Sequence, residues 1–114
     1  MSLTAYRSAH SAAERPRAAE YRLLAEVTGG LVAAQARATR DPALVAALDA
    51  NRRLWTALAL DCGQEGNRLP DALRAQIISL GLWVSRYASE VARGDGDIDD
   101  LIAVNRSVME GLSA

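Results

Sequence analysis

The 114-residue sequence contains no phenylalanine, no lysine, one cysteine and one histidine. Because Cys62 is the single thiol, the chain cannot form an internal disulfide or a thiolate metal site. His10 has no second histidine or cysteine with which to form a metal ligand set. No glycine-rich loop follows a predicted strand, so a nucleotide-binding fingerprint lacks its context. We therefore expect no enzyme, no metal and no cofactor.

Long apolar runs are also missing. No segment approaches the length that a membrane span requires, and the N-terminus has no apolar signal-peptide region. The net charge of −1 argues against electrostatic binding to nucleic acid. Half of the residues are apolar, which is enough for one domain with a modest core. A cytoplasmic, single-domain protein is the expectation.

The composition that remains is rich in alanine and leucine, which are strong helix formers. Each of the three prolines stands just before a long segment with helical periodicity, where its missing N–H costs nothing. Asp41 and Asp97 are suited to cap helix N-termini, and Gly63 and Gly94 to end helices in the left-handed conformation. The predicted helices are roughly 17–40, 42–61, 70–93 and 98–112.

Four amphipathic helices with short connections predict an all-α fold, an antiparallel helical bundle of four main helices with a short N-terminal helix or arm. Residues 1–15 are expected to form a weakly ordered arm, and residues 16–114 the bundle. Gly29-Gly30 in the first helix has two interpretations, close helix packing through small residues or a hinge. The aspartates at 95, 97, 99 and 100 predict a capped turn rather than a calcium loop, because the far-end glutamate of such a loop is missing.

Asn51 and Asn105 fall within the apolar stripes of the second and fourth helices. A buried amide without partners costs about 1–3 kcal/mol. We expect the two amides to form hydrogen bonds across the core and to fix the helix register, as single buried asparagines do in coiled coils. Polar contact with a partner protein is the alternative.

The segment 70–93 carries more apolar surface than one core stripe needs. Ile78 and Leu82 fall opposite that stripe, and Trp83 lies on its flank. In a four-helix bundle no helix is surrounded, so this back face must be covered by the N-terminal arm or by another protein. The candidate partner-binding residues are Ile78, Leu82 and Trp83, with Trp55 as a second aromatic anchor. For both tryptophans, core packing is the structural alternative.

Four stretches in this order and spacing resemble the flagellar biosynthesis regulator FlaF family of alphaproteobacteria. They are PRAAEYRLLAEVT (16–28), ALDANRRLWTALALDC (47–62), GNRLPDALRAQIISLGLWVSRY (66–87) and IDDLIAVNRSVMEGL (98–112). The resemblance covers nearly the whole chain, and the part before Pro16 matches least well.

The resemblance implies a non-enzymatic protein needed for flagellin production. Proteins of this family act opposite the regulator FlbT, which restrains flagellin translation, and are thought to bind flagellin as export chaperones. The terminal segments of flagellin are amphipathic and unfolded before assembly, so a helical bundle with excess apolar surface suits them.

Three other hypotheses remain open. The first is an RNA-binding regulator of flagellin message, in which seven arginines contact phosphates. The second is a homodimer that buries Ile78 and Leu82 through a two-fold interface. The third places the arm around Tyr6 over the same surface until a partner displaces it. The arginines of the first hypothesis are Arg15, Arg17, Arg22, Arg37, Arg40, Arg52 and Arg53.

Overall fold

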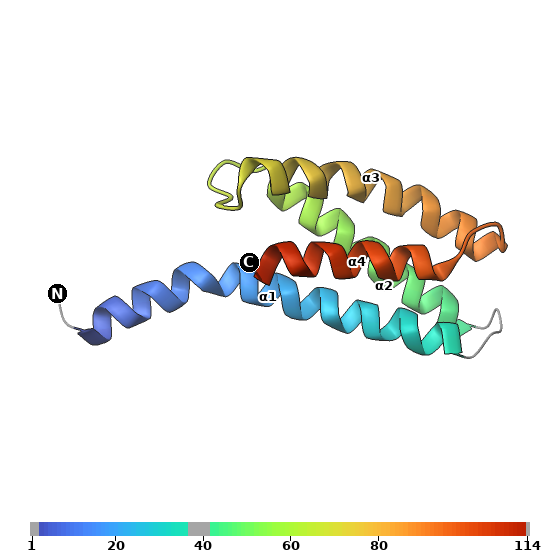
Figure 1. Ribbon diagram of the computed structural model, residues 1–114, viewed down its shortest axis with the longest axis horizontal. Coiled ribbons are helices and arrows are strands. Elements are labelled where there is room, and N and C mark those ends of the chain that lie inside the picture. The colour runs from blue at the N-terminus through green and yellow to red at the C-terminus, as the bar shows by residue number, and fades with distance from the viewer. Residues whose placement is uncertain (1–2, 37–41, 114) are drawn as a thin grey trace.

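A computed structural model describes residues 3–36 and 42–113, with side-chain positions from residue 17 onward. Four α-helices account for nearly all of these residues: α1 (Leu3–Ala36), α2 (Pro42–Cys62), α3 (Asp71–Arg93) and α4 (Ile98–Ser113). Successive helices run in opposite directions (Figure 1). The predicted all-α antiparallel bundle is confirmed.

The helices form a closed ring of neighbours around one core. Helix α1 packs against α2 and α4, and α3 packs against the same two helices. Each helix contributes residues spaced by three and four to the centre, as the periodicity predicts. Fully buried members of the core are Leu24, Leu31, Trp55, Ile77, Val84, Leu101 and Val108.

Helix α1 begins earlier than predicted. The predicted start at residue 17 is wrong, because the helix runs unbroken from Leu3 through Pro16. Alanine, arginine and glutamate on both sides of Pro16 are good helix formers, and the helix continues although proline removes one backbone hydrogen bond. In Figure 1 the first part of α1 extends beyond the other helices, so it does not cover α3.

The glycine pair of α1 lies within the continuous helix. A methyl group added at Gly30 would meet the Ala47 side chain of α2 at 4.0 Å, and one added at Gly29 would meet nothing within 4 Å. Packing of small residues between helices therefore applies to Gly30 alone, and Gly29 faces outward.

The C-terminus of α3 and the N-terminus of α4 have the predicted caps. Gly94 has a φ of 86°, and the backbone N–H groups of Gly94 and Asp95 donate to the carbonyls of Val91 and Glu90. Asp97 caps α4, because its Oδ1 accepts the backbone N–H of Asp99 at 2.9 Å. The corresponding prediction for Gly63 is wrong, since the left-handed glycine of the α2–α3 loop is Gly66, with a φ of 88°. The predicted cap at Asp41 lies outside the described residues.

The aspartates of the α3–α4 turn have protein partners. Asp99 accepts a hydrogen bond from Gln35 of α1, and Asp100 accepts one from the Tyr87 hydroxyl. The same hydroxyl accepts the backbone N–H of Asp97 at 2.9 Å. The prediction of a capped turn is therefore confirmed, and Tyr87 ties this turn to α3.

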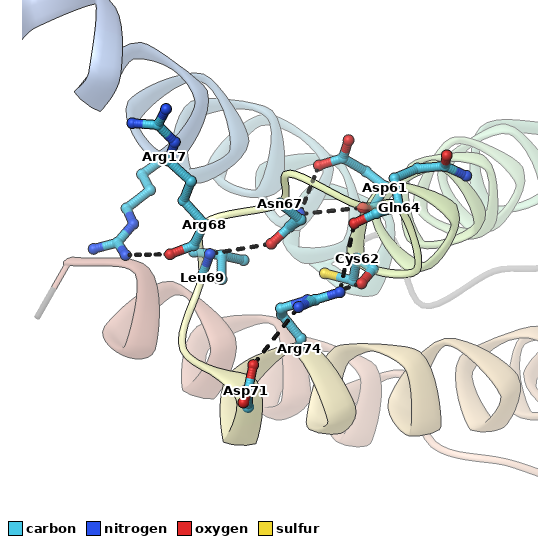
Figure 2. Close-up of polar contacts among 9 residues, drawn as sticks. All are labelled: Arg17, Asp61, Cys62, Gln64, Asn67, Arg68, Leu69, Asp71 and Arg74. Atoms are coloured by element: carbon cyan, nitrogen blue, oxygen red, sulfur yellow. Dashed lines mark hydrogen bonds and ion pairs between the residues drawn. The ribbon is translucent and has the colours of Figure 1, made fainter.

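The α2–α3 loop is fixed by two side chains shown in Figure 2. Arg74 donates from Nε to the carbonyl oxygen of Cys62 at 3.0 Å, where its charge faces the negative end of α2. The Asn67 amide donates to the Asp61 carbonyl at 3.2 Å, and its Oδ1 accepts the N–H of Leu69 at 3.1 Å. The loop therefore holds α2 and α3 in one defined arrangement.

Asn105 is the centre of a polar network inside the apolar core. Its Oδ1 accepts the indole N–H of Trp55 at 2.8 Å. Its Nδ2 donates to Asn51 Oδ1 at 2.7 Å and to Thr28 Oγ1 at 3.0 Å. Both asparagines are fully buried, so the predicted hydrogen bond between them across the core is confirmed. The network joins α1, α2 and α4 in a single register.

Replacing Asn105 with leucine is expected to lower the free energy of unfolding by about 2–4 kcal/mol, because the Trp55 N–H and Asn51 Oδ1 would be buried without partners. Urea unfolding measures this loss. Ser107→Leu, which adds the same side chain at an exposed position of α4, serves as the control. A loss for Asn105→Leu no larger than that of the control would contradict the structural role of the network.

Gly94→Ala is expected to cost about 1 kcal/mol of stability, because an L-residue is strained at positive φ. Gly63→Ala is the matched control. A methyl group there would meet only ordinary contacts, at 3.5 Å from the Leu60 carbonyl oxygen. Thermal unfolding of the two variants should separate them, and equal melting temperatures would refute the assignment.

Candidate partner-binding surface

Three exposed aliphatic side chains lie on α2 and α3 near the contact between these two helices. Leu60 of α2 is 65% exposed, and Ile78 and Leu82 of α3 are 38% and 67% exposed. We call this surface, centred on Leu60, Ile78 and Leu82, the α2–α3 face. Other exposed large apolar residues of the described chain are Tyr21, Leu23, Val32 and Val45.

Close packing of the two helices brings these residues together. A methyl group added at Gly81 would lie 3.2 Å from Cβ of Ala59 and 3.6 Å from the Trp55 carbonyl oxygen, so α3 approaches the backbone of α2 here. Leu58 and Leu80, which precede Ala59 and Gly81, turn toward the core, so Leu60 and Leu82, which follow them, turn outward. Leucine neighbours of the helix contact therefore face solvent on both helices.

Trp83 does not belong to the same face. It lies 100° around α3 from Leu82, on the flank that faces α4, and its partly buried ring packs against the core. The ring stacks on Tyr87 with centroids 4.6 Å apart and an interplanar angle of 14°. The structure thus separates Trp83 from Ile78 and Leu82, which the sequence analysis had grouped.

Trp55 is enclosed in the core with no exposed surface. Its place in the apolar stripe of α2 and the hydrogen bond from its indole to Asn105 explain why. The expectation that Trp55 is a second anchor at the surface must therefore be corrected, and the structural alternative of core packing holds.

The comparisons with known proteins bear on the flagellar resemblance. The family model described as flagellar protein FlaF matches residues 2–112. The chain belongs to the FlaF family. Neither the curated proteins nor the solved structures include a match to it.

Membership gives this FlaF-family protein a role in flagellum biogenesis. Within the described residues no helix is long and apolar enough to cross a membrane. The match extends over all four helices. It includes the part of α1 before Pro16, where the resemblance seen in the sequence was weakest.

Leu60 of this FlaF-family protein was not predicted as a surface residue from the sequence. Leu60 lies off the core stripe of α2 that contains Leu58 and Cys62, in the way that Ile78 and Leu82 lie off the stripe of α3. An apolar residue outside the stripe was the available signal. Only the α2–α3 packing, however, shows that the two sets meet on one face.

A second feature that the sequence did not indicate is a pair of carboxyl groups, Glu20 of α1 and Asp61 near the end of α2. Burial raises the pKa of the Glu20 carboxyl, and the nearby carboxyl group of Asp61 raises it further. Glu20 Oε2 is buried without a hydrogen-bond partner. The folded protein therefore holds a proton on Glu20 more strongly than the unfolded chain does.

Cys62 lies beside this pair. The residue is 2% exposed, and burial, followed by the charges of Glu20 and Asp61, raises the pKa of its thiol. A nucleophilic thiol needs a lowered pKa and access to solvent. This environment favours a packing role for Cys62.

Glu20→Gln is expected to raise the melting temperature at about pH 7 more than at about pH 5. The raised pKa in the folded state means that stability falls as pH rises from the ordinary glutamate range through the shifted value. Glutamine removes the charge and so removes this loss. Thermal melts across this pH range measure the difference between the variant and the parent protein.

Glu26→Gln, at an exposed position of α1, is the matched control and should leave the pH dependence of the parent protein unchanged. If the melting temperatures of Glu20→Gln and the parent protein changed with pH in parallel, the carboxyl pair would have no influence on the pH dependence of stability.

Proposed function

We propose that this protein is a non-enzymatic chaperone that binds the terminal helical segments of flagellin on its α2–α3 face. Through this binding it regulates flagellin synthesis. The observation that supports the proposal best is the cluster of Leu60, Ile78 and Leu82, which no other described helix covers. Flagellin as the partner comes from the family resemblance.

The α2–α3 face has the properties of a surface for a partner helix. Covering the exposed part of a leucine side chain contributes about 1–2 kcal/mol, and two leucines and an isoleucine lie together here. The two helices beneath them are packed closely at Gly81 and joined by a fixed loop. A partner would therefore meet a preorganised surface.

Flagellin terminal segments have the complementary chemistry. An amphipathic segment that is unfolded before assembly can fold as a helix on an apolar surface, where the buried area offsets the entropy lost on ordering. Such binding would keep the segment from associating with other flagellin chains before export. The chemistry requires shape and apolar contact but no catalytic group.

We place this activity in the cytoplasm, where flagellin is synthesised. The regulator FlbT, which the resemblance sets opposite this family, is the functional partner in the proposal. Flagellin bound on the α2–α3 face would signal to FlbT that the chaperone is occupied. The burial and raised pKa of Cys62 also favour a binding protein over a thiol enzyme.

Ile78→Asp combined with Leu82→Asp is expected to abolish flagellin binding, because each carboxylate would have to be desolvated under the partner. Both positions are exposed in the free protein, so helix content by circular dichroism should stay unchanged. Co-purification with intact flagellin, beside flagellin that lacks its terminal segments, measures the binding.

The matched control is Leu23→Asp combined with Val32→Asp, at exposed positions of α1 with 43% and 38% exposure. This pair should leave binding intact. Unchanged binding by the Ile78 and Leu82 variant would reject the α2–α3 face. Light scattering over a dilution series measures self-association. If the Ile78 and Leu82 variant loses self-association but still binds flagellin, the α2–α3 face is a homodimer interface instead.

A further inference from the structure

Helix α3 meets α2 at a position where α3 has no side chain. A methyl group added at Gly81 would lie 3.2 Å from Cβ of Ala59, 3.6 Å from the Trp55 carbonyl oxygen and 3.9 Å from the Trp55 ring carbon Cε3. Carbon atoms in ordinary contact are about 3.5–4.0 Å apart. The first of these distances is too short, so atoms of α2 already fill the space beside Gly81.

The atoms around Gly81 are fixed in place. Cβ of Ala59 is bonded directly to the backbone, and no side-chain rotation can move it away from α3. The Trp55 carbonyl belongs to the backbone of α2, and the Trp55 ring is enclosed in the core and hydrogen-bonded to Asn105. A side chain at position 81 must therefore move α3 away from α2.

Gly111 of α4 is crowded at the same distance but by a different kind of atom. A methyl group added there would lie 3.2 Å from Cδ1 of Leu73 on α3. This carbon is at the end of a side chain with rotatable bonds, and Leu73 is only partly buried. The leucine end can move, so α3 and α4 keep their separation. Gly81 differs because the backbone itself must yield.

The separation of α2 and α3 decides how the α2–α3 face presents its residues. Leu60 belongs to α2, whereas Ile78 and Leu82 belong to α3. A change in the separation would therefore move Leu60 relative to the other two. A partner that contacts both helices at once would lose some of these contacts, and a partner that contacts α3 alone would lose none.

We propose that Gly81 is a positioning residue for flagellin binding. Because it has no side chain, α2 and α3 keep the separation at which one amphipathic flagellin segment contacts Leu60 together with Ile78 and Leu82. Gly81 acts through these three residues. The inference rests on the proposed function and adds that the bound segment spans both helices. With the separation already set in the free protein, binding has no cost for moving α2 and α3.

The test is a calorimetric titration of the full chain with synthetic peptides of the flagellin terminal segments. Gly81→Ala is expected to weaken binding about fivefold, because the added methyl group displaces α3 from α2. The double variant Ala59→Gly with Gly81→Ala transfers the methyl group from α2 to α3 and removes the short contact. It is expected to bind within about twofold of the parent protein.

Gly111→Ala is the matched control and should change the affinity less than about twofold, because Leu73 can move. Each variant is titrated at a temperature at which circular dichroism shows it to be fully folded, so that a loss of stability alone does not lower the affinity. Three results would each overturn the positioning role: parent-like binding by Gly81→Ala, equal losses in Gly81→Ala and Gly111→Ala, or no recovery in the double variant.

Leu60→Asp tests the inference even if Gly81→Ala does not fold. Leu60 is 65% exposed on α2, and Val45 of the same helix is 63% exposed, so Val45→Asp is its matched control. Leu60→Asp is expected to weaken binding about tenfold and Val45→Asp less than about twofold. Parent-like binding by Leu60→Asp would place the partner on α3 alone and overturn the inference. If binding still depends on Ile78 and Leu82 in that case, the proposed function stands without it; if binding does not, both fail.

Discussion

The hydrogen bonds of Asn105 are the constraint on which the rest of this bundle depends. One amide on α4 holds the indole of Trp55 and the amide of Asn51, both from α2, and the hydroxyl of Thr28 from α1. In an otherwise apolar core, sliding a helix by one turn would leave several of these groups buried without partners. The register of three helices is therefore fixed by polar geometry, and apolar packing fills the space around it.

Trp55 extends this constraint to α3, the helix that contributes no group to the network. Its side chain is anchored to α4 and its backbone carbonyl lies against Gly81 of α3. The close approach at Gly81 sets the spacing of α2 and α3, and this spacing places Leu60 beside Ile78 and Leu82. The apolar surface that we assign to flagellin is thus a consequence of the core, because the same tryptophan that completes the interior positions the helices that carry the exterior.

Much of the fold could be predicted from the sequence, since local signals decide it. Apolar periodicity marked the four helices, Gly94 and Asp97 marked the last turn, and the two asparagines in apolar stripes indicated a hydrogen bond across the core. The start of α1 was not predicted because proline usually marks a helix boundary, and the left-handed residue of the α2–α3 loop is Gly66, whereas Gly63 was predicted.

The surface was predicted in part. Ile78 and Leu82 stand out within one helix, but the addition of Leu60 and the separation of Trp83 depend on how α2 and α3 pack. The Glu20 and Asp61 pair comes from segments 41 residues apart and has no local signal.

The position of Asn105 in the chain has a consequence for biosynthesis. During translation α1, α2 and α3 are synthesised before Asn105, the residue that satisfies Trp55 and Asn51, is added. The α2–α3 hairpin, joined by a short loop, can form early because its contacts are local. Its interior polar groups must share hydrogen bonds with water until the last sixteen-residue helix is complete. A chain in which α4 has not yet packed would thus present a hydrated, loosely packed interior, so closure of the core depends on α4.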